Sequence, residues 1–289
     1  MSVINTNVKA LYTHAALKTT EAGSLKAMQQ LSTGKRINSA KDDAAGLAIA
    51  ARMTQQIEGL NQGIRNAGDA IAMIQTTEGA TDSITTMLLR ISELSMQAAN
   101  DTYSDTQRSF LNNEFTQLKQ EINRMSKTHE WNGFKILAGA DRAGTGEAPL
   151  SLYFQIGDAA DQRIQVDLPN FSQAGTVTNL IFKKKDLSGD SSIATVAGAQ
   201  EVLDLAKQSL DKVSESRSMM GAAMNRLEHV IANLTNVSMN SSASRSQIQD
   251  ADYATASTAL AKSQIMEQAA TAVLAQANTS QQTVLKLLG

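Results

Sequence analysis

The cluster of side chains that most resembles a reactive site lies in residues 31–53. They read LSTGKRINSAKDDAAGLAIAARM, a Gly-Lys-Arg step followed by Asp42 and Asp43. A phosphate loop needs a second glycine five residues before Gly34 and a Ser or Thr after the lysine, and both are missing. Two carboxylates could act as an acid/base pair, but Ser39 followed by acids is also typical of a helix start. We therefore predict a joint, with one helix ending near Gly34 and the next beginning near Asp42.

The sequence gives no better support for a metal site or a catalytic nucleophile. His129-Glu130 begins like the zinc-binding HExxH motif, but residue 133 is glycine instead of histidine. The chain has 0 cysteines, which excludes disulfides, thiol catalysis and zinc–thiolate sites. We expect no catalytic residue, no cofactor and no metal, and an enzyme with a protease in its middle segment is the weaker alternative.

Composition indicates long helices in thin bundles. Only 4% of the 289 residues are aromatic and 2 are proline. The 26 basic and 28 acidic side chains give a net charge of -2, so the chain lacks the excess of positive charge that is typical of nucleic-acid-binding proteins. The N-terminal segment MSVINTNVKALYTH does not resemble a cleaved secretory signal, and no apolar run is long enough for membrane insertion.

Apolar residues spaced three and four apart predict long, coiled-coil-like helices. One stripe runs from Ile57 to Ile91 and a second from Leu210 to Val237, and two such stripes most simply pack on each other. A capping box at Ser104–Gln107 opens a third helix. We expect it to fold back on the first helix through a turn near residues 100–103.

The two ends of the chain carry further stripes. At the start these residues are Ile4, Val8 and Leu11, and at the end Met266, Ala270, Val273, Ala277, Val284 and Leu287. Isolated helices this rich in Ala and Ser are marginal in water. Each end therefore needs a partner, which is the other terminus, neighbouring copies of the chain, or both.

The middle of the chain changes character. It holds both prolines, and its short alternating runs at Leu152–Ile156 and Ile164–Leu168 predict strands between glycine-rich turns. The predicted fold class is mainly α, with a helical bundle built from both halves and a small central β subdomain. The expected domains are an inner terminal domain (1–41 and 248–289), a bundle domain (42–130 and 195–247) and an outward β-rich region (131–194).

Several long motifs together resemble bacterial flagellin, the subunit of the flagellar filament. The resemblance covers about residues 1–139 and 195–289. It rests on MSVINTNVKAL at the start, LSTGKRINSAKDDAAGLAIA, LLRISELSMQAAN at 88–100, SRSQIQDADYATAS and the ending QIMEQAATAVLAQANTSQQTVLKLLG.

The resemblance implies a function and a set of partners. Flagellins are extracellular, and their termini meet in an inner domain that orders when copies assemble head-to-tail. The family is exported unfolded by the flagellar type III apparatus, and a chaperone covers the C-terminal segment, here Met266–Leu288. Flagellar cap and junction proteins are further implied partners. The alternative is a hook–filament junction protein or another flagellar axial protein, which would assemble through its chain ends in the same way.

The resemblance also implies recognition by a host Toll-like receptor that senses flagellin. In activating relatives the receptor-facing patch lies on the first long helix, in the block matching 88–100, with help from the following helix. The positions that match here are Leu88, Arg90, Glu93, Leu94, Gln97 and Glu114. A solvated helix face or a contact between filament subunits would explain Arg90 and Glu93 equally well.

Overall fold

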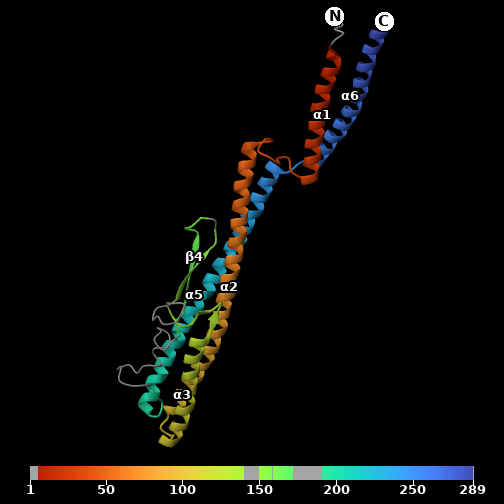
Figure 1. Ribbon diagram of the computed structural model, residues 1–289. Coiled ribbons are helices and arrows are strands. Elements are labelled where there is room, and N and C mark those ends of the chain that lie inside the picture. Colours follow the sequence, from red (N-terminus) through yellow and green to blue (C-terminus); the bar gives the residue numbers. More distant parts are fainter. Residues whose placement is uncertain (1–5, 140–149, 158, 172–190, 289) are drawn as a thin grey trace. The chain divides into compact units, whose positions relative to one another are not determined.

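The computed structural model describes residues 6–139, 150–157, 159–171 and 191–288, with side chains up to residue 280 (Figure 1). These residues form five helices and two antiparallel hairpins. The helices are α1 (Val8–Thr33), α2 (Ala44–Ala98), α3 (Asp105–Thr128), α5 (Val196–Gln249) and α6 (Tyr253–Leu288). The strands are β1 (Glu130–Trp131), β2 (Phe134–Lys135), β3 (Leu150–Gln155) and β4 (Arg163–Leu168). The predicted fold class, mainly α with a small β subdomain, is confirmed.

The chain divides into two compact units. Unit 1 contains Met1–Ile57 and Ser238–Gly289, and unit 2 contains Glu58–Val237. The divisions fall inside α2 and α5, whereas the domain boundaries expected from sequence lie at 41/42, in the joint between α1 and α2, and at 247/248, in the last turn of α5. Each long helix therefore contributes to both units.

The core of unit 2 is built from large apolar side chains on the predicted stripes. Ile74, Ile84 and Ile91 of α2 are fully buried, as is Leu227 of α5. At the surface, Arg217 of α5 forms ion pairs with α2. Its guanidinium nitrogens lie 3.1 Å from Asp82 Oδ1 and 3.5 Å from Glu78 Oε1. The two long helices of unit 2 thus share one complete hydrophobic core.

The predicted start of α3 is confirmed in detail. The Ser104 hydroxyl accepts a hydrogen bond from Gln107 N, and the Gln107 side chain accepts one from Ser104 N, which completes the capping box. Arg108 is buried beside this turn, where its Nε donates to Ala98 O at 3.0 Å and its Nη2 to Asn100 O at 3.2 Å. The bond to Ala98 O satisfies a carbonyl at the end of α2, and the bond to Asn100 O adds to the one that this carbonyl accepts from Tyr103 N.

The central β region consists of two small hairpins in the described residues. In β4, Ile164, Val166 and Leu168 are buried while the residues between them are exposed, as the alternating pattern predicts. The β1–β2 hairpin was not predicted from sequence. It turns at Asn132 and Gly133, whose φ angles of 48° and 79° are those of a type I′ turn.

A glycine on α2 allows the β3 end to approach closely. A Cβ on Gly63 would overlap the carbonyl oxygen of Ile156, the residue that follows β3. One turn further along α2, Asn66 Nδ2 donates to Gln155 O at 2.7 Å. Gly63 thus allows the backbone after β3 to pack directly on α2, because only glycine leaves room for it.

In unit 1, α1 and α6 lie side by side and antiparallel (Figure 1). Asn7 Nδ2 donates to Ala277 O at 3.3 Å near the start of α1, and Gly23 lies beside Ser263 further along. Helix α1 ends at Gly34, which adopts φ 68° and returns its N–H to Gln30 O. The predicted helix end near Gly34 is therefore confirmed.

The Gly-Lys-Arg segment pairs with the chain between α5 and α6. Arg36 N donates to Gln249 O at 2.7 Å, and Ala251 N donates to Gly34 O at 2.9 Å. The Arg36 side chain adds a bond from Nη2 to Ile248 O at 2.6 Å. The Gly-Lys-Arg segment thus connects the joint between α1 and α2 to the joint between α5 and α6 by hydrogen bonds. It does not form a phosphate loop.

The two aspartates have separate structural roles. Asp43 begins α2, because its Oδ1 accepts a hydrogen bond from Gly46 N at 2.9 Å; Ser39 was expected to supply this cap. Asp42 Oδ1 lies 3.0 Å from Lys26 Nζ of α1, and its Oδ2 accepts the backbone N–H groups of Ser39 and Asn38. The bond from Lys26, followed by the two backbone bonds, lowers the pKa of Asp42 to about 2.

We predict opposite effects for two Gly→Ala substitutions on α2. Gly63→Ala forces β3 away from the helix and should destabilise the protein by about 1–3 kcal/mol, the usual cost of overpacking. Gly68→Ala is the matched control, since no atom lies within 4 Å of its added Cβ, and it should stabilise the helix by about 0.5–1 kcal/mol. Urea unfolding of both variants measures this, and equal effects would contradict the close approach.

We predict that Asp42 contributes to acid sensitivity. Its pKa is lowered on folding, from 3.8 to about 2, so its stabilising effect is fully present above about pH 4 and disappears as the pH falls towards 2. Asp42→Asn should therefore lower the free energy of unfolding at pH 6 but not at pH 2. A double-mutant cycle with Lys26→Met should show a coupling that vanishes over the same pH range. A coupling independent of pH would contradict the pairing.

Candidate functional site

The helices of unit 1 face each other mainly through small side chains. The less exposed residues of both helices recur at intervals of three and four; among them Ala27, Ala256 and Ala277 are buried, and Leu17, Leu260 and Leu274 are partly sheltered. Other large apolar side chains lie outside this contact. They are Val8, Leu11, Tyr12, Leu25 and Met28 on α1, and Ile265, Met266 and Val273 on α6. The pair is thus closely packed inside and apolar outside.

The structure separates the residues predicted on the C-terminal stripe. Ala270 and Ala277 are sheltered towards α1, whereas Met266 and Val273 are exposed. Val8 and Leu11, predicted on the N-terminal stripe, are exposed as well. Ile4 and the side chains of Val284 and Leu287 lie outside the described residues. The predicted stripe is therefore two faces, one for the partner helix and one turned outward.

Four of the outward apolar side chains, two on each helix, lie on opposite sides of the pair. Leu25 and Met28 each directly follow a sheltered residue of α1, and Met266 and Val273 each directly precede one of α6. Successive residues of a helix turn by 100° in a fixed sense. Because the helices are antiparallel, a step forward on one and a step back on the other lead to opposite sides.

A second candidate surface lies on unit 2, where Arg90 bridges two helices. Its Nε lies 2.7 Å from Glu114 Oε1 of α3, and its Nη1 lies 3.0 Å from Glu93 Oε2 of α2. The side chain of Arg90 is 47% exposed. The hydrogen bond to Glu114, followed by that to Glu93, raises the pKa of Arg90 above its ordinary value. A fixed guanidinium flanked by two carboxylates can present charge-assisted hydrogen bonds to a partner.

Two residues predicted for this surface are in the core. Leu88 and Leu94 are fully buried, so in this conformation they pack inside unit 2 and offer no surface to a partner. Gln97 is exposed, and its Nε2 donates to the Tyr103 hydroxyl at 3.0 Å. The predicted set is thereby reduced to Arg90, Glu93, Gln97 and Glu114.

Sequence reasoning missed the exposed apolar residues of these two helices. Leu89 and Met96 of α2 and Phe110 of α3 are each more than half exposed. Leu89 and Met96 are seven residues apart and hence on one face of α2, next to Arg90 and Glu93. The seven-residue spacing of Leu89 and Met96 is present in the sequence, but the buried apolar stripe next to them is longer and gives the stronger pattern.

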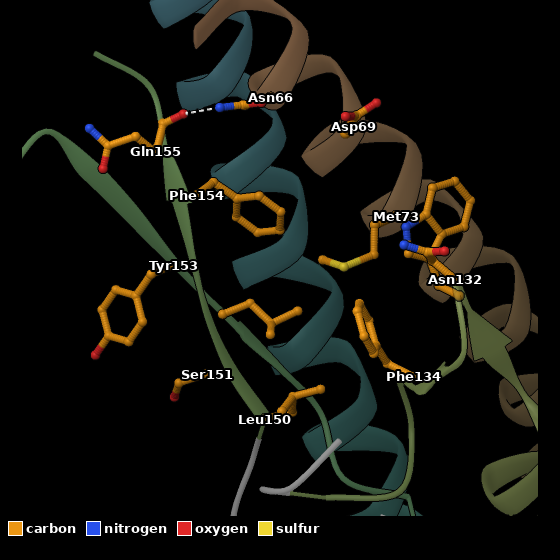
Figure 2. A pocket seen from close by; sticks show the side chains of 12 residues that line it. Asn66, Asp69, Met73, Asn132, Phe134, Leu150, Ser151, Tyr153, Phe154 and Gln155 are labelled. Atoms are coloured by element: carbon orange, nitrogen blue, oxygen red, sulfur yellow. Dashed lines mark hydrogen bonds between the residues drawn. The ribbon is translucent and has the colours of Figure 1, made fainter. Parts of the chain in front are cut away.

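The described residues of unit 2 also line a groove of about 950 Å³ between α2 and the hairpins (Figure 2). Met73, Phe134 and Leu150 point into it, and Asn66 and Asp69 lie at its rim. Asp69 is the one carboxylate in the described lining, so the groove holds no acid/base pair. Across the described residues, no cluster of three His, Asp or Glu side chains could hold a metal ion.

Comparisons with known proteins agree with these features. Residues 4–142 match the model of the bacterial flagellin N-terminal helical region, and residues 203–288 match that of the C-terminal helical region. The chain is 39% identical to a flagellin of Halalkalibacterium halodurans and 37% identical to the flagellar filament 31.3 kDa core protein of Treponema maltophilum. Each alignment covers 99% of both chains.

The crystal structure of Bacillus cereus flagellin is 25% identical, with a TM-score of 0.49, and the match covers 59% of this chain and 88% of that one. None of the described helices has a stretch apolar enough to cross a membrane. The resemblance drawn from the terminal motifs is confirmed. The chain belongs to the bacterial flagellins, the structural subunits of the flagellar filament.

Proposed function

We propose that this flagellin polymerises head-to-tail through the outward apolar faces of its α1–α6 pair. The supporting observation is the exposure of large side chains in unit 1: Leu25 is 67% exposed and Val273 56%. Covering one such side chain with a neighbouring subunit stabilises the contact by about 1.5–3 kcal/mol. A single copy leaves all of them in water.

The placement of these faces favours an open polymer. An apolar face on one side of the pair can dock against the different apolar face on the opposite side of the next copy. Such a contact between unlike surfaces repeats without pairing off into a closed dimer, and it builds a helix when the rotation does not close into a ring. Two faces on the same side would instead favour a symmetric dimer.

We propose in addition that the terminal helices become fully ordered when the subunit assembles. Among the described side chains of α1 and α6, Ala27, Ala256 and Ala277 are the buried apolar ones, so the pair itself removes little apolar area from water. A chain end of this kind suits export in an unfolded state to the outside of the cell. A chaperone that covers Met266–Leu288 would keep the exposed apolar side chains from associating early. Cap and junction proteins would present the matching face at the filament ends.

The proposal extends to a host Toll-like receptor that senses flagellin. Arg90 is exposed and fixed between Glu93 and Glu114, and Leu89 lies beside it. Arginine and exposed apolar side chains are typical of the residues that dominate binding at interfaces. A contact between filament subunits would use the same composition, so binding has to be measured with monomeric protein.

We predict that Val273→Asp abolishes assembly while leaving the monomer folded. Position 273 is exposed, so the melting temperature should stay near that of the wild type. In a filament the carboxylate would be buried without a partner, which costs several kcal/mol, and the critical concentration should rise at least tenfold. Ala272→Asp is the control and should assemble, because residue 272 is exposed and lies midway between the sheltered Ala270 and Leu274, pointing away from both faces. Normal seeded filaments of Val273→Asp in electron micrographs would refute the proposed face.

We also predict that Arg90→Ala weakens binding of monomeric protein to the receptor ectodomain by at least tenfold, a loss of about 1.4 kcal/mol. Arg124→Ala is the matched control, because Arg124 is an exposed arginine paired with Glu121 three residues away on α3. Surface plasmon resonance with both variants measures the difference. Equal affinity of Arg90→Ala and wild type would contradict a role for Arg90 in receptor binding.

A further inference from the structure

Methionine carries all the sulfur chemistry of this chain, which has 12 methionines and 0 cysteines. Five methionines in the described residues are exposed: Met28, Met96, Met219, Met239 and Met266. Two others are buried in the core of unit 2, where Met73 is 2% exposed and Met220 1%. An oxidant that reaches the surface therefore meets one group of methionines and not the other.

Two of the exposed methionines lie on the outward faces of unit 1. Met28 on α1 is 51% exposed and Met266 on α6 is 52% exposed. They belong to the opposite sides described above, so each contact between successive subunits would use one or both of them. Neither lies in the small-residue contact between α1 and α6, so a change at their sulfur leaves that contact intact.

We propose that Met28 and Met266 are oxidation sites that control whether a free subunit can join the polymer. The inference rests on the proposed assembly face. The oxidant is a peroxide, such as hydrogen peroxide. A lone pair of the thioether sulfur attacks one peroxide oxygen, the S–O bond forms, the O–O bond breaks and water leaves. The sulfur loses two electrons, the peroxide gains them, and the product is methionine sulfoxide.

The sulfoxide matters because it is polar. In the free subunit it stays in water, and the fold is unaffected. In a contact between subunits its oxygen would need a hydrogen-bond donor that an apolar face does not supply, and a buried polar group without a partner costs about 1–3 kcal/mol. With one such group in every repeated contact, an oxidised subunit cannot be incorporated stably. The reaction is reversible by methionine sulfoxide reductases.

Assembly should protect the same residues. Once Met28 and Met266 are covered by neighbouring subunits, peroxide reaches them slowly. The sensitivity therefore belongs to the subunit before incorporation, when it is outside any polymer. Leucine at the same positions would keep the apolar face and remove the reactive sulfur, since Met and Leu have similar volumes.

The experiment treats purified full-length monomer with hydrogen peroxide and measures oxidation at each methionine by peptide mass spectrometry. Met28 and Met266 should oxidise at least tenfold faster than Met73 and Met220, which report that the fold is intact. Seeded assembly, followed by sedimentation, should then fall at least tenfold. In preformed filaments the oxidation of Met28 and Met266 should slow by at least tenfold. Complete oxidation of both residues with normal assembly would overturn the proposal.

Matched variants assign the effect to these two sulfurs. Peroxide should leave the assembly of M28L/M266L at the level of the same variant before treatment, whereas M96L/M219L, which removes two exposed methionines of unit 2, should lose assembly after treatment as the wild type does. Loss of assembly in peroxide-treated M28L/M266L would overturn the proposal. Reduction of oxidised wild type by a mixture of MsrA and MsrB should restore polymer yield, and no recovery after reduction confirmed by mass would also overturn it. Untreated wild type that fails to polymerise would instead contradict the proposed function.

Discussion

The pairing of the two chain ends through small side chains constrains the rest of unit 1. Alanine and serine let α1 and α6 approach closely, as the proximity of Gly23 and Ser263 illustrates. The same small residues bury little apolar area. Some larger apolar side chains, such as Leu17 and Leu274, are partly sheltered in the contact, whereas others, such as Met28 and Val273, face outward. The sequence of α1 and α6 therefore gives a contact that is close but buries little apolar area, and it leaves apolar side chains on the outside of the pair.

Unit 2 makes the opposite choice. Its core is filled by Ile, Leu and Phe side chains, with Phe115 and Leu88 fully buried, and it is complete within one copy. At the joint in unit 1, backbone hydrogen bonds from Arg36 to Gln249 and from Ala251 to Gly34 bind the chain segments together beside the buried side chain of Ile37. The chain thus combines a region that is self-sufficient with one whose apolar surface exceeds what it can bury.

Much of the fold follows from the sequence because its period is regular. The stripes on α2 and α5, the capping box at Ser104 and the helix end at Gly34 were predicted correctly, since each depends on local spacing. The β1–β2 hairpin was missed although Asn132-Gly133 is a strong type I′ signal, because two-residue strands give no alternation to detect. The cap of α2 was assigned to Ser39 instead of Asp43, a shift of one turn that spacing alone does not resolve.

The candidate surfaces were harder to predict for a physical reason. A heptad pattern shows that a residue lies on an apolar face, but not whether that face meets the chain's own partner helix or remains outside. Leu88 and Leu94 were thought to be on the surface and are buried, whereas Met266 and Val273 share a stripe with Ala270 and Ala277 and are exposed. The structure resolves the ambiguity where size alone does not, since Leu274 is sheltered in the α1–α6 contact while its neighbour Val273 is exposed. The large apolar residues that remain exposed after the two helices have paired mark the surface left for another molecule.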